Sequence, residues 1–191
     1  MRDALYGLYG ALRMARMDGS GIDYIGRDAR SAWASLWALA VIVPGQMVLI
    51  LIADWPRIAE GTMLGVIALR ALAVVISVVG YLLIVESLLR LTLGTQHFAR
   101  FMATMNWVGA VQVGIGVPLL LLTQVQAVPI PAAQFIGIVV SLWSLFFQGL
   151  AARRSLEVGR LAAAGLVVLD IFTSQFVDAL AEATLWPPAA G

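Results

Sequence analysis

The sequence predicts an all-α membrane protein, a polytopic bundle of five transmembrane helices preceded by an N-terminal amphipathic helix at the membrane interface. Of the 191 residues, 61% are apolar and only 12% are charged, whereas soluble domains carry roughly 45–50% and about 25%. The mean hydropathy is +0.93. Apolar stretches long enough to cross a bilayer core of about 30 Å recur between charged, Pro or Gly breaks. These features exclude an ordinary water-soluble domain.

Five apolar stretches have the length of a membrane-spanning helix, which is about 20 residues. They are residues 34–53, 62–85, 101–123, 132–150 and 161–183. Together they form one transmembrane domain, residues 34–183, with short connections. The fifth stretch contains Asp170 and Asp178. A four-span arrangement in which this last helix lies on the membrane surface is therefore the alternative.

The distribution of arginine predicts the orientation of the helices, because basic residues collect in cytoplasmic loops. All 12 basic residues are Arg. Ten of them lie in the N-terminal segment and in two alternate connections: Arg2, Arg13, Arg16, Arg27, Arg30, Arg90, Arg100, Arg153, Arg154 and Arg160. Of the other two, Arg57 follows the first span and Arg70 lies inside the second. Residues 1–33 are therefore predicted to be cytoplasmic, and the tail, residues 184–191, external.

Residues 1–17 are predicted to form an amphipathic helix. Its apolar side chains recur at i, i+3, i+4 and i+7, which places them on one face: Leu5, Leu8, Tyr9 and Leu12. Arg13 and Arg16 point toward another face, and two Gly within residues 18–21 end the helix. Such a helix lies on a membrane surface, here the cytoplasmic one. Docking of a soluble partner is the alternative role.

Composition argues against several classes of function. The formal net charge is +1, so there is no basic excess for binding nucleic acid. With no Cys and one His, neither a thiolate site nor a multi-His metal site is expected. No nucleophile elbow, P-loop or zinc-protease motif occurs. We therefore expect a non-enzymatic protein without a metal or cofactor. An intramembrane aspartyl hydrolase would need two carboxylates from facing helices, whereas Asp170 and Asp178 lie on the same predicted span.

Ionisable residues inside the predicted spans are the candidate functional residues, because each costs at least about 2.5–3.5 kcal/mol in the bilayer. Arg70 lies about 12 Å from the external end of the second span, and Asp178 lies at a similar depth in the fifth. An ion pair between them would offset the desolvation of both groups and pin two helices together. A gate or a site for an anionic substrate at Arg70 is the alternative.

Four polar residues of the fifth span follow one another at steps of i+4 and therefore share a helical face: Asp170, Ser174, Asp178 and Glu182. The structural interpretation is that this stripe faces the bundle interior and bonds to polar groups there, namely Asn106, Gln112, Gln134, Gln148 or Arg70. The functional interpretation is a proton or cation path with Asp170 near mid-membrane. The absence of internal repeats, which many carriers have, favours the structural one.

Small residues and tryptophans predict how the helices pack and where they meet the membrane surface. Close approach of neighbouring helices is expected at small residues, here Gly109, Gly114, Gly116 and the pairs Gly137 with Ser141 and Ala73 with Ser77. Indole rings anchor helices at the headgroup level, which is expected of Trp33, Trp37, Trp55, Trp107 and Trp186.

The first predicted span begins Ser-Ala-Trp-Ala-Ser-Leu-Trp at residues 31–37 and contains Pro44, and the third begins with Met-Asn-Trp at residues 105–107. With five closely spaced helices, this layout resembles the Yip1-type multi-pass membrane proteins over about residues 33–183. The resemblance implies a membrane scaffold that acts with partner membrane proteins, and it supplies no functional residues. The short N-terminal segment and the charged fifth span depart from it.

We therefore expect an integral protein of the bacterial inner membrane that serves as a non-enzymatic scaffold or accessory subunit. Its partners would be the lipid bilayer and either other membrane proteins or further copies of itself. The bacterial source is inferred from the exclusive use of Arg and the abundance of Ala, Gly, Leu and Val. The main alternative is a small transporter or channel subunit that uses Arg70, Asp170 and Asp178, and the third is a lipid-handling protein.

Overall fold

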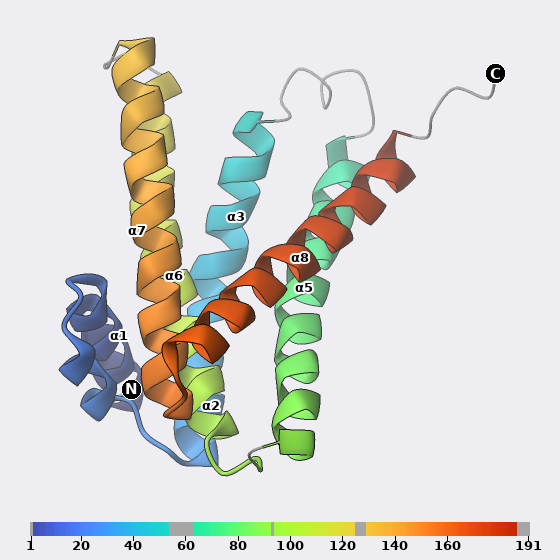
Figure 1. Ribbon diagram of the computed structural model, residues 1–191. Helices are drawn as coiled ribbons and strands as arrows, with labels where there is room; N and C mark the ends of the chain where they lie inside the picture. Colours follow the sequence, from blue (N-terminus) through green and yellow to red (C-terminus); the bar gives the residue numbers. More distant parts are fainter. Residues whose placement is uncertain (1, 54–62, 93, 125–128, 187–191) are drawn as a thin grey trace.

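The computed structural model describes residues 2–53, 63–92, 94–124 and 129–186, in which all regular structure is helical (Figure 1). Its elements are α1 (Arg2–Ala15), η1 (Gly19–Tyr24), α2 (Ala29–Ser35), η2 (Leu36–Ala38), α3 (Leu39–Ala53), α5 (Met63–Thr92), α6 (Phe98–Gln124), α7 (Ile130–Leu156) and α8 (Arg160–Leu185). Trp55 and Arg57, expected at the end of the first span and in the loop after it, lie outside the described residues.

The five expected apolar helices are present, each long and apolar enough to cross a membrane. The first combines α2, η2 and α3 over Ala29–Ile52, and the others are α5, α6, α7 and α8, with 26 to 30 residues each. This is the architecture of an integral membrane protein. The helices run past the predicted spans, since α5 continues to Thr92. Glu86 and Arg90 pair one turn apart on this extension at 2.7 Å, which supports the extra turns.

The helices α3, α6 and α7 form one group, and α5 packs on it through α3 and through α8. In Figure 1, α3, α6 and α7 stand together while α5 lies to one side, and α8 runs obliquely across the bundle. It packs on both α5 and α7. One end of the bundle carries Arg90, Arg100, Arg153, Arg154 and Arg160 and is here called the arginine-rich end. Two buried clusters form the core, one around Phe147 and Val108 and the other around Phe101 and Val85.

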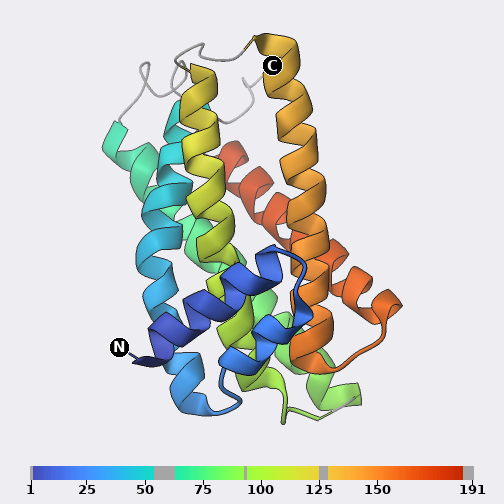
Figure 2. The same cartoon turned by 90° about the vertical axis from the view of Figure 1, so that its left-hand side faces the viewer.

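The N-terminal segment folds back against the bundle. Figure 2 shows α1 crossing α6 and α7 near the arginine-rich end. Its packed face consists of small residues and one Met: Gly7, Gly10, Ala11 and Met14. The predicted apolar face points outward, with Leu5, Leu8, Tyr9 and Leu12 each 36–68% exposed. Residues 2–15 are thus helical, and the membrane surface as the partner of the apolar face stays a prediction.

Trp107 does not anchor the bundle at a membrane surface, and that expectation was wrong. Its side chain is 7% exposed because the indole packs on Gly7 of α1, where any Cβ would collide with the ring. Trp143 of α7 also contacts this segment, its Nε1 donating a hydrogen bond of 2.8 Å to the carbonyl of Ala15. By contrast, Trp33 and Trp37 are exposed.

The turn between α1 and η1 is closed by Asp18. Its carboxylate accepts hydrogen bonds from the backbone N–H of Ser20 at 3.0 Å and from the Ser20 hydroxyl at 2.7 Å, and it pairs with the guanidinium of Arg13. These donors lower the pKa of Asp18 to about 2. The stability contributed by the ionised carboxylate is present above its ordinary pKa of 3.8 and is lost only as the pH falls toward 2.

Three of the glycines expected at close helix contacts make none. A Cβ at Gly114, Gly116 or Gly137 would meet nothing within 4 Å, because α6 and α7 separate toward the end opposite the arginine-rich end (Figure 2). A groove of about 750 Å³ lies between them there. The expectation holds at Gly109, where a Cβ would lie 3.0 Å from Ile42 of α3. The helix α6 therefore packs tightly against α3 at Gly109 and more loosely against α7 at this end.

Candidate functional site

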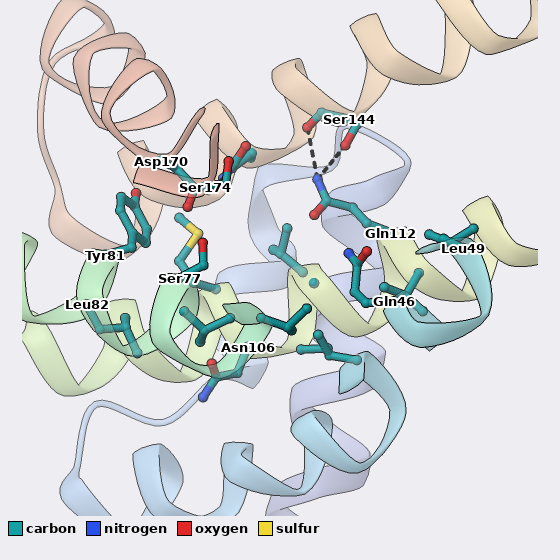
Figure 3. Close-up of a pocket in the computed structure, with 18 of the residues that line it drawn as sticks. Gln46, Leu49, Ser77, Tyr81, Leu82, Asn106, Gln112, Ser144, Asp170 and Ser174 are labelled. Carbon is teal, nitrogen blue, oxygen red and sulfur yellow. Dashed lines mark hydrogen bonds between the residues drawn. The ribbon is translucent and has the colours of Figure 1, made fainter. Parts of the chain in front are cut away.

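A polar cavity of about 420 Å³ lies among the candidate membrane-spanning helices, and α3, α5, α6, α7 and α8 all contribute to its walls (Figure 3). Its polar side chains form two groups. One surrounds Asp170 of α8 and includes Ser174 with Ser77 and Tyr81 of α5; the other includes Gln46, Gln112 and Ser144 from α3, α6 and α7. The remaining wall is largely aliphatic.

The group around Asp170 is held by hydrogen bonds across and within helices. The amide of Gln148 on α7 donates to the Asp170 carboxylate. The Tyr81 hydroxyl donates to the carbonyl of Leu166 at 3.2 Å, and the Ser174 hydroxyl donates to the carbonyl of Ile171 at 3.0 Å. Because both hydroxyl protons are committed to carbonyls, the hydroxyl lone pairs are what these residues offer to a ligand.

The second group links α6 to α7. The Gln112 amide nitrogen donates to the Ser144 hydroxyl at 2.6 Å and to the Ser144 carbonyl at 3.3 Å. Asn106 also lines the cavity, but its amide nitrogen is directed away from it, to the Ser35 hydroxyl at 2.9 Å. Asn106 thus joins α6 to α2 rather than serving a ligand.

Of the polar stripe predicted on the fifth span, three residues line the cavity: Asp170, Ser174 and Asp178. Glu182 shares their face by periodicity but is not among the lining residues, since the cavity ends before the last turns of α8. Gln112 and Gln148, which were expected as partners of the stripe, line the same cavity. Gln134 belongs instead to the groove between α6 and α7.

Arg70 lies beside the cavity rather than in its wall. The residue is 8% exposed, and its Nη1 lies 3.9 Å from the Asp178 carboxylate, as the sequence predicted. Its guanidinium carbon also stands 5.6 Å from the centre of the Trp186 ring. These contacts join α5 to α8, which is the structural role expected of the pair.

Four polar residues of the cavity were missed from the sequence: Gln46, Ser77, Tyr81 and Ser144. Ser77 and Tyr81 are one helical turn apart on α5, a spacing that places them on one face, but Ser77 was considered only as a small packing residue. Gln46 is the one strongly polar side chain in α3. An isolated polar residue in an apolar span shows that something polar is near, yet it does not identify the partner.

Chemically, the cavity offers carboxylate, amide and hydroxyl groups. Among the described lining residues, Asp170 and Asp178 are acidic and none is basic. In the part of the chain that the structure describes, no three His, Cys, Asp or Glu side chains gather as a metal site. The arrangement suits a polar molecule that donates hydrogen bonds and carries positive charge.

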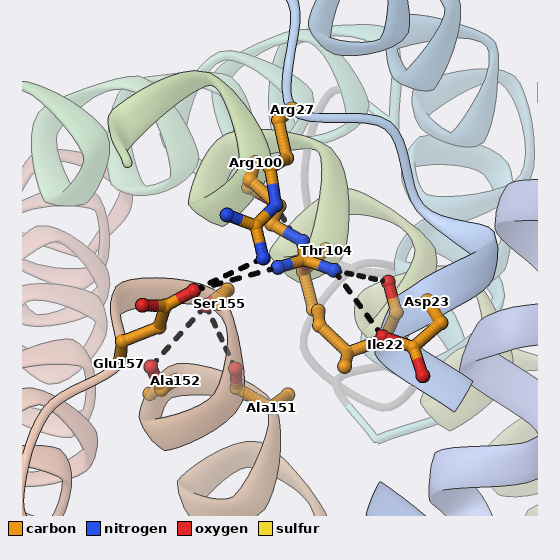
Figure 4. A network of polar contacts seen from close by, with 9 residues as sticks. All are labelled: Ile22, Asp23, Arg27, Arg100, Thr104, Ala151, Ala152, Ser155 and Glu157. Carbon is orange, nitrogen blue, oxygen red and sulfur yellow. Dashed lines mark hydrogen bonds and ion pairs between the residues drawn. The ribbon is translucent and has the colours of Figure 1, made fainter. Parts of the chain in front are cut away.

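A second polar cluster lies at the arginine-rich end (Figure 4). Arg100 of α6 is 4% exposed and donates to the carbonyl of Ile22 at 2.9 Å. Asp23 and Glu157 each lie 3.8 Å from its guanidinium, and Arg27 pairs with the same Glu157 oxygen at 3.1 Å. The cluster ties the N-terminal segment to α6 and to the turn between α7 and α8.

Replacing Arg100 with Met is expected to loosen the N-terminal segment. The change removes the charge-assisted hydrogen bond from Arg100 to the buried Ile22 carbonyl, which keeps only the one from the backbone N–H of Ile25, whereas Asp23 and Glu157 are exposed and stay hydrated. The free energy of unfolding should therefore fall by about 1.5–3 kcal/mol, and trypsin should cleave faster after Arg16. Arg90→Met removes an exposed helix pair and should cost under about 0.5 kcal/mol. Equal effects of the two variants would contradict this role of Arg100.

Comparison with known proteins gives no match: no family model, no curated protein and no solved structure is similar to this chain.

Proposed function

We propose that this protein is a small carrier of the bacterial inner membrane, which binds a polar solute in the cavity around Asp170 and moves it across the bilayer. The supporting observation is the cavity itself, because all five candidate membrane-spanning helices contribute to it. The arginine distribution supports an orientation with the N-terminus in the cytoplasm.

The cost of polar groups in a bilayer supports a binding role. A carboxylate in a membrane-spanning helix is expensive and usually marks a substrate or ion pathway. Packing alone would be satisfied by apolar or small residues at this place. Here Asp170 instead shares an unfilled space with Ser77, Tyr81 and Ser174. Asp178, which also lines the cavity, has a side chain that is 51% exposed.

A scaffold or accessory-subunit role, which the Yip1-type resemblance implies, is the second candidate. The outward apolar face of α1, with Leu5, Tyr9 and Leu12, favours it as a surface for membrane or protein contacts. The two functions differ in what the cavity does. A carrier needs the cavity open, whereas a scaffold tolerates its filling.

The carrier proposal is tested by filling the cavity. Ser77→Phe places a large ring in the space, and Val75→Phe makes the same addition on an exposed part of α5. Uptake of radiolabelled phenethylamine, choline, mannitol and lactate is measured in proteoliposomes. We expect uptake of at least one solute above that of protein-free vesicles, abolished by Ser77→Phe and retained by Val75→Phe. Uptake that is absent for all four solutes, or insensitive to Ser77→Phe, would contradict the proposal.

A further inference from the structure

We infer that the cavity binds an amphipathic organic cation with a primary or secondary ammonium group, placed beside Asp170. This inference names the substrate class of the proposed carrier and so rests on that function. It follows from three properties of the cavity: its charge, its hydrogen-bonding character and the contrast between its walls.

The charge of the cavity favours a cation. Asp170 receives its hydrogen bond from the neutral amide of Gln148, and none of the described lining residues is basic. The nearest arginine on α5, Arg70, is directed to Asp178. A carboxylate within membrane-spanning helices is stabilised by a positive partner. A positively charged ligand would supply that partner to Asp170, and an anion would be repelled.

The hydrogen bonds favour a ligand that only donates. The hydroxyl protons of Tyr81 and Ser174 are directed to the carbonyls of Leu166 and Ile171. Toward the cavity these oxygens therefore act as acceptors, as does the Asp170 carboxylate. An ammonium group has N–H donors and no acceptor, which matches this set. A quaternary ammonium has no N–H and would match the charge alone.

The size and walls of the cavity favour an organic body rather than a bare ion. A volume of about 420 Å³ exceeds that of one water, which occupies about 30 Å³ in the liquid, by more than tenfold. Hard metal cations need oxygen ligands on all sides. The rest of the wall is instead largely aliphatic, with Leu49, Val74 and Val78 among its residues. An apolar group attached to the ammonium would lie against that wall.

The experiment measures binding to the purified full-length protein in nanodiscs by titration calorimetry. The probes share a phenylethyl body and differ in the head group: phenethylamine, its N,N,N-trimethyl derivative, 2-phenylethanol and 3-phenylpropionate. Phenethylamine should bind most tightly, the trimethyl derivative roughly 10-fold and the alcohol roughly 30-fold more weakly, and the carboxylate should not bind. Asp170→Asn should weaken phenethylamine binding roughly 30-fold or more, and Glu182→Gln should leave it unchanged.

A second variant keeps the test decisive if Asp170→Asn fails to fold. Tyr81→Phe removes one acceptor and should weaken phenethylamine roughly 5- to 10-fold without affecting the trimethyl derivative. Binding of the alcohol or carboxylate as tight as that of the amine, or no binding of any probe, would overturn the inference. Uptake blocked by Ser77→Phe would then still support a carrier for another solute. Amine binding without uptake would support the site and contradict the carrier.

Discussion

Replacing Asp170 with Asn is expected to reduce uptake of phenethylamine into proteoliposomes by about 100-fold, while the protein still folds. Asn keeps the shape of the side chain and an oxygen that accepts from Gln148, but it removes the negative charge. A 100-fold loss corresponds to about 2.7 kcal/mol, which lies within the range for a hydrogen bond to a charged group in a buried site. The measurement is the initial rate of radiolabelled uptake, with the same lipid-to-protein ratio for every variant.

The matched control for this change is Glu182→Gln. It makes the same replacement of a carboxylate by an amide three turns further along α8, outside the cavity wall. Uptake by this variant should stay within about twofold of the unmodified protein. Thermal unfolding in detergent shows that each variant is folded. Equal uptake by the unmodified protein and by Asp170→Asn would show that Asp170 takes no part in transport.

The second large effect is expected where α1 meets η1. A Cβ at Gly10 would lie 2.5 Å from the carbonyl oxygen of Gly21, and a Cβ at Gly21 would meet that of Gly10. Because the obstructing atoms are backbone, no change of rotamer relieves the collision. Gly10→Ala should therefore lower the free energy of unfolding by about 2–3 kcal/mol and should release α1 from the bundle.

Gly114→Ala on α6 is the control for this prediction. Its Cβ would meet nothing within 4 Å, and Ala is favoured over Gly inside a helix by roughly 0.5–1 kcal/mol. We therefore expect a small stabilisation there. Denaturant unfolding measures both variants, and cleavage by trypsin after Arg13 and Arg16 reports on the release of α1. A Gly10→Ala protein as stable as the unmodified one would show that α1 does not pack as described.

The elements of the fold could be predicted because the signals are local. Apolar runs of membrane-spanning length gave all five long helices, and the spacing of Leu5, Leu8 and Leu12 gave α1. The face on which α1 packs could not be predicted in this way. Its small residues face the bundle since only glycine at position 7 admits the Trp107 ring. A hydrophobic pattern ranks residues by apolar area and so overlooks a contact made through glycine.

The candidate site was predictable only in part for a related reason. Helical periodicity placed Asp170, Ser174 and Asp178 on one face, and they do share the cavity. The same periodicity included Glu182, which does not line the cavity. The helix α8 runs obliquely across the bundle (Figure 1), and periodicity within one helix does not show how far along that helix its polar face lies against the other helices. The contribution of Ser77 depends on which helix packs against α8, and a single span does not carry that information.

The most direct test of a cation-accepting cavity uses the absence of cysteine from the chain. Ser174→Cys places a thiol in the cavity wall, and Phe172→Cys places one on an exposed part of the same helix outside it. In proteoliposomes, we predict that the cationic trimethylammonium-ethyl methanethiosulfonate labels Cys at position 174 at least about 10-fold faster than the anionic sulfonatoethyl reagent. Neither reagent should label position 172, which lies outside the cavity. Asp170→Asn should abolish the difference between the two labelling rates at position 174. No labelling at position 174, or equal rates for the two reagents, would contradict the account.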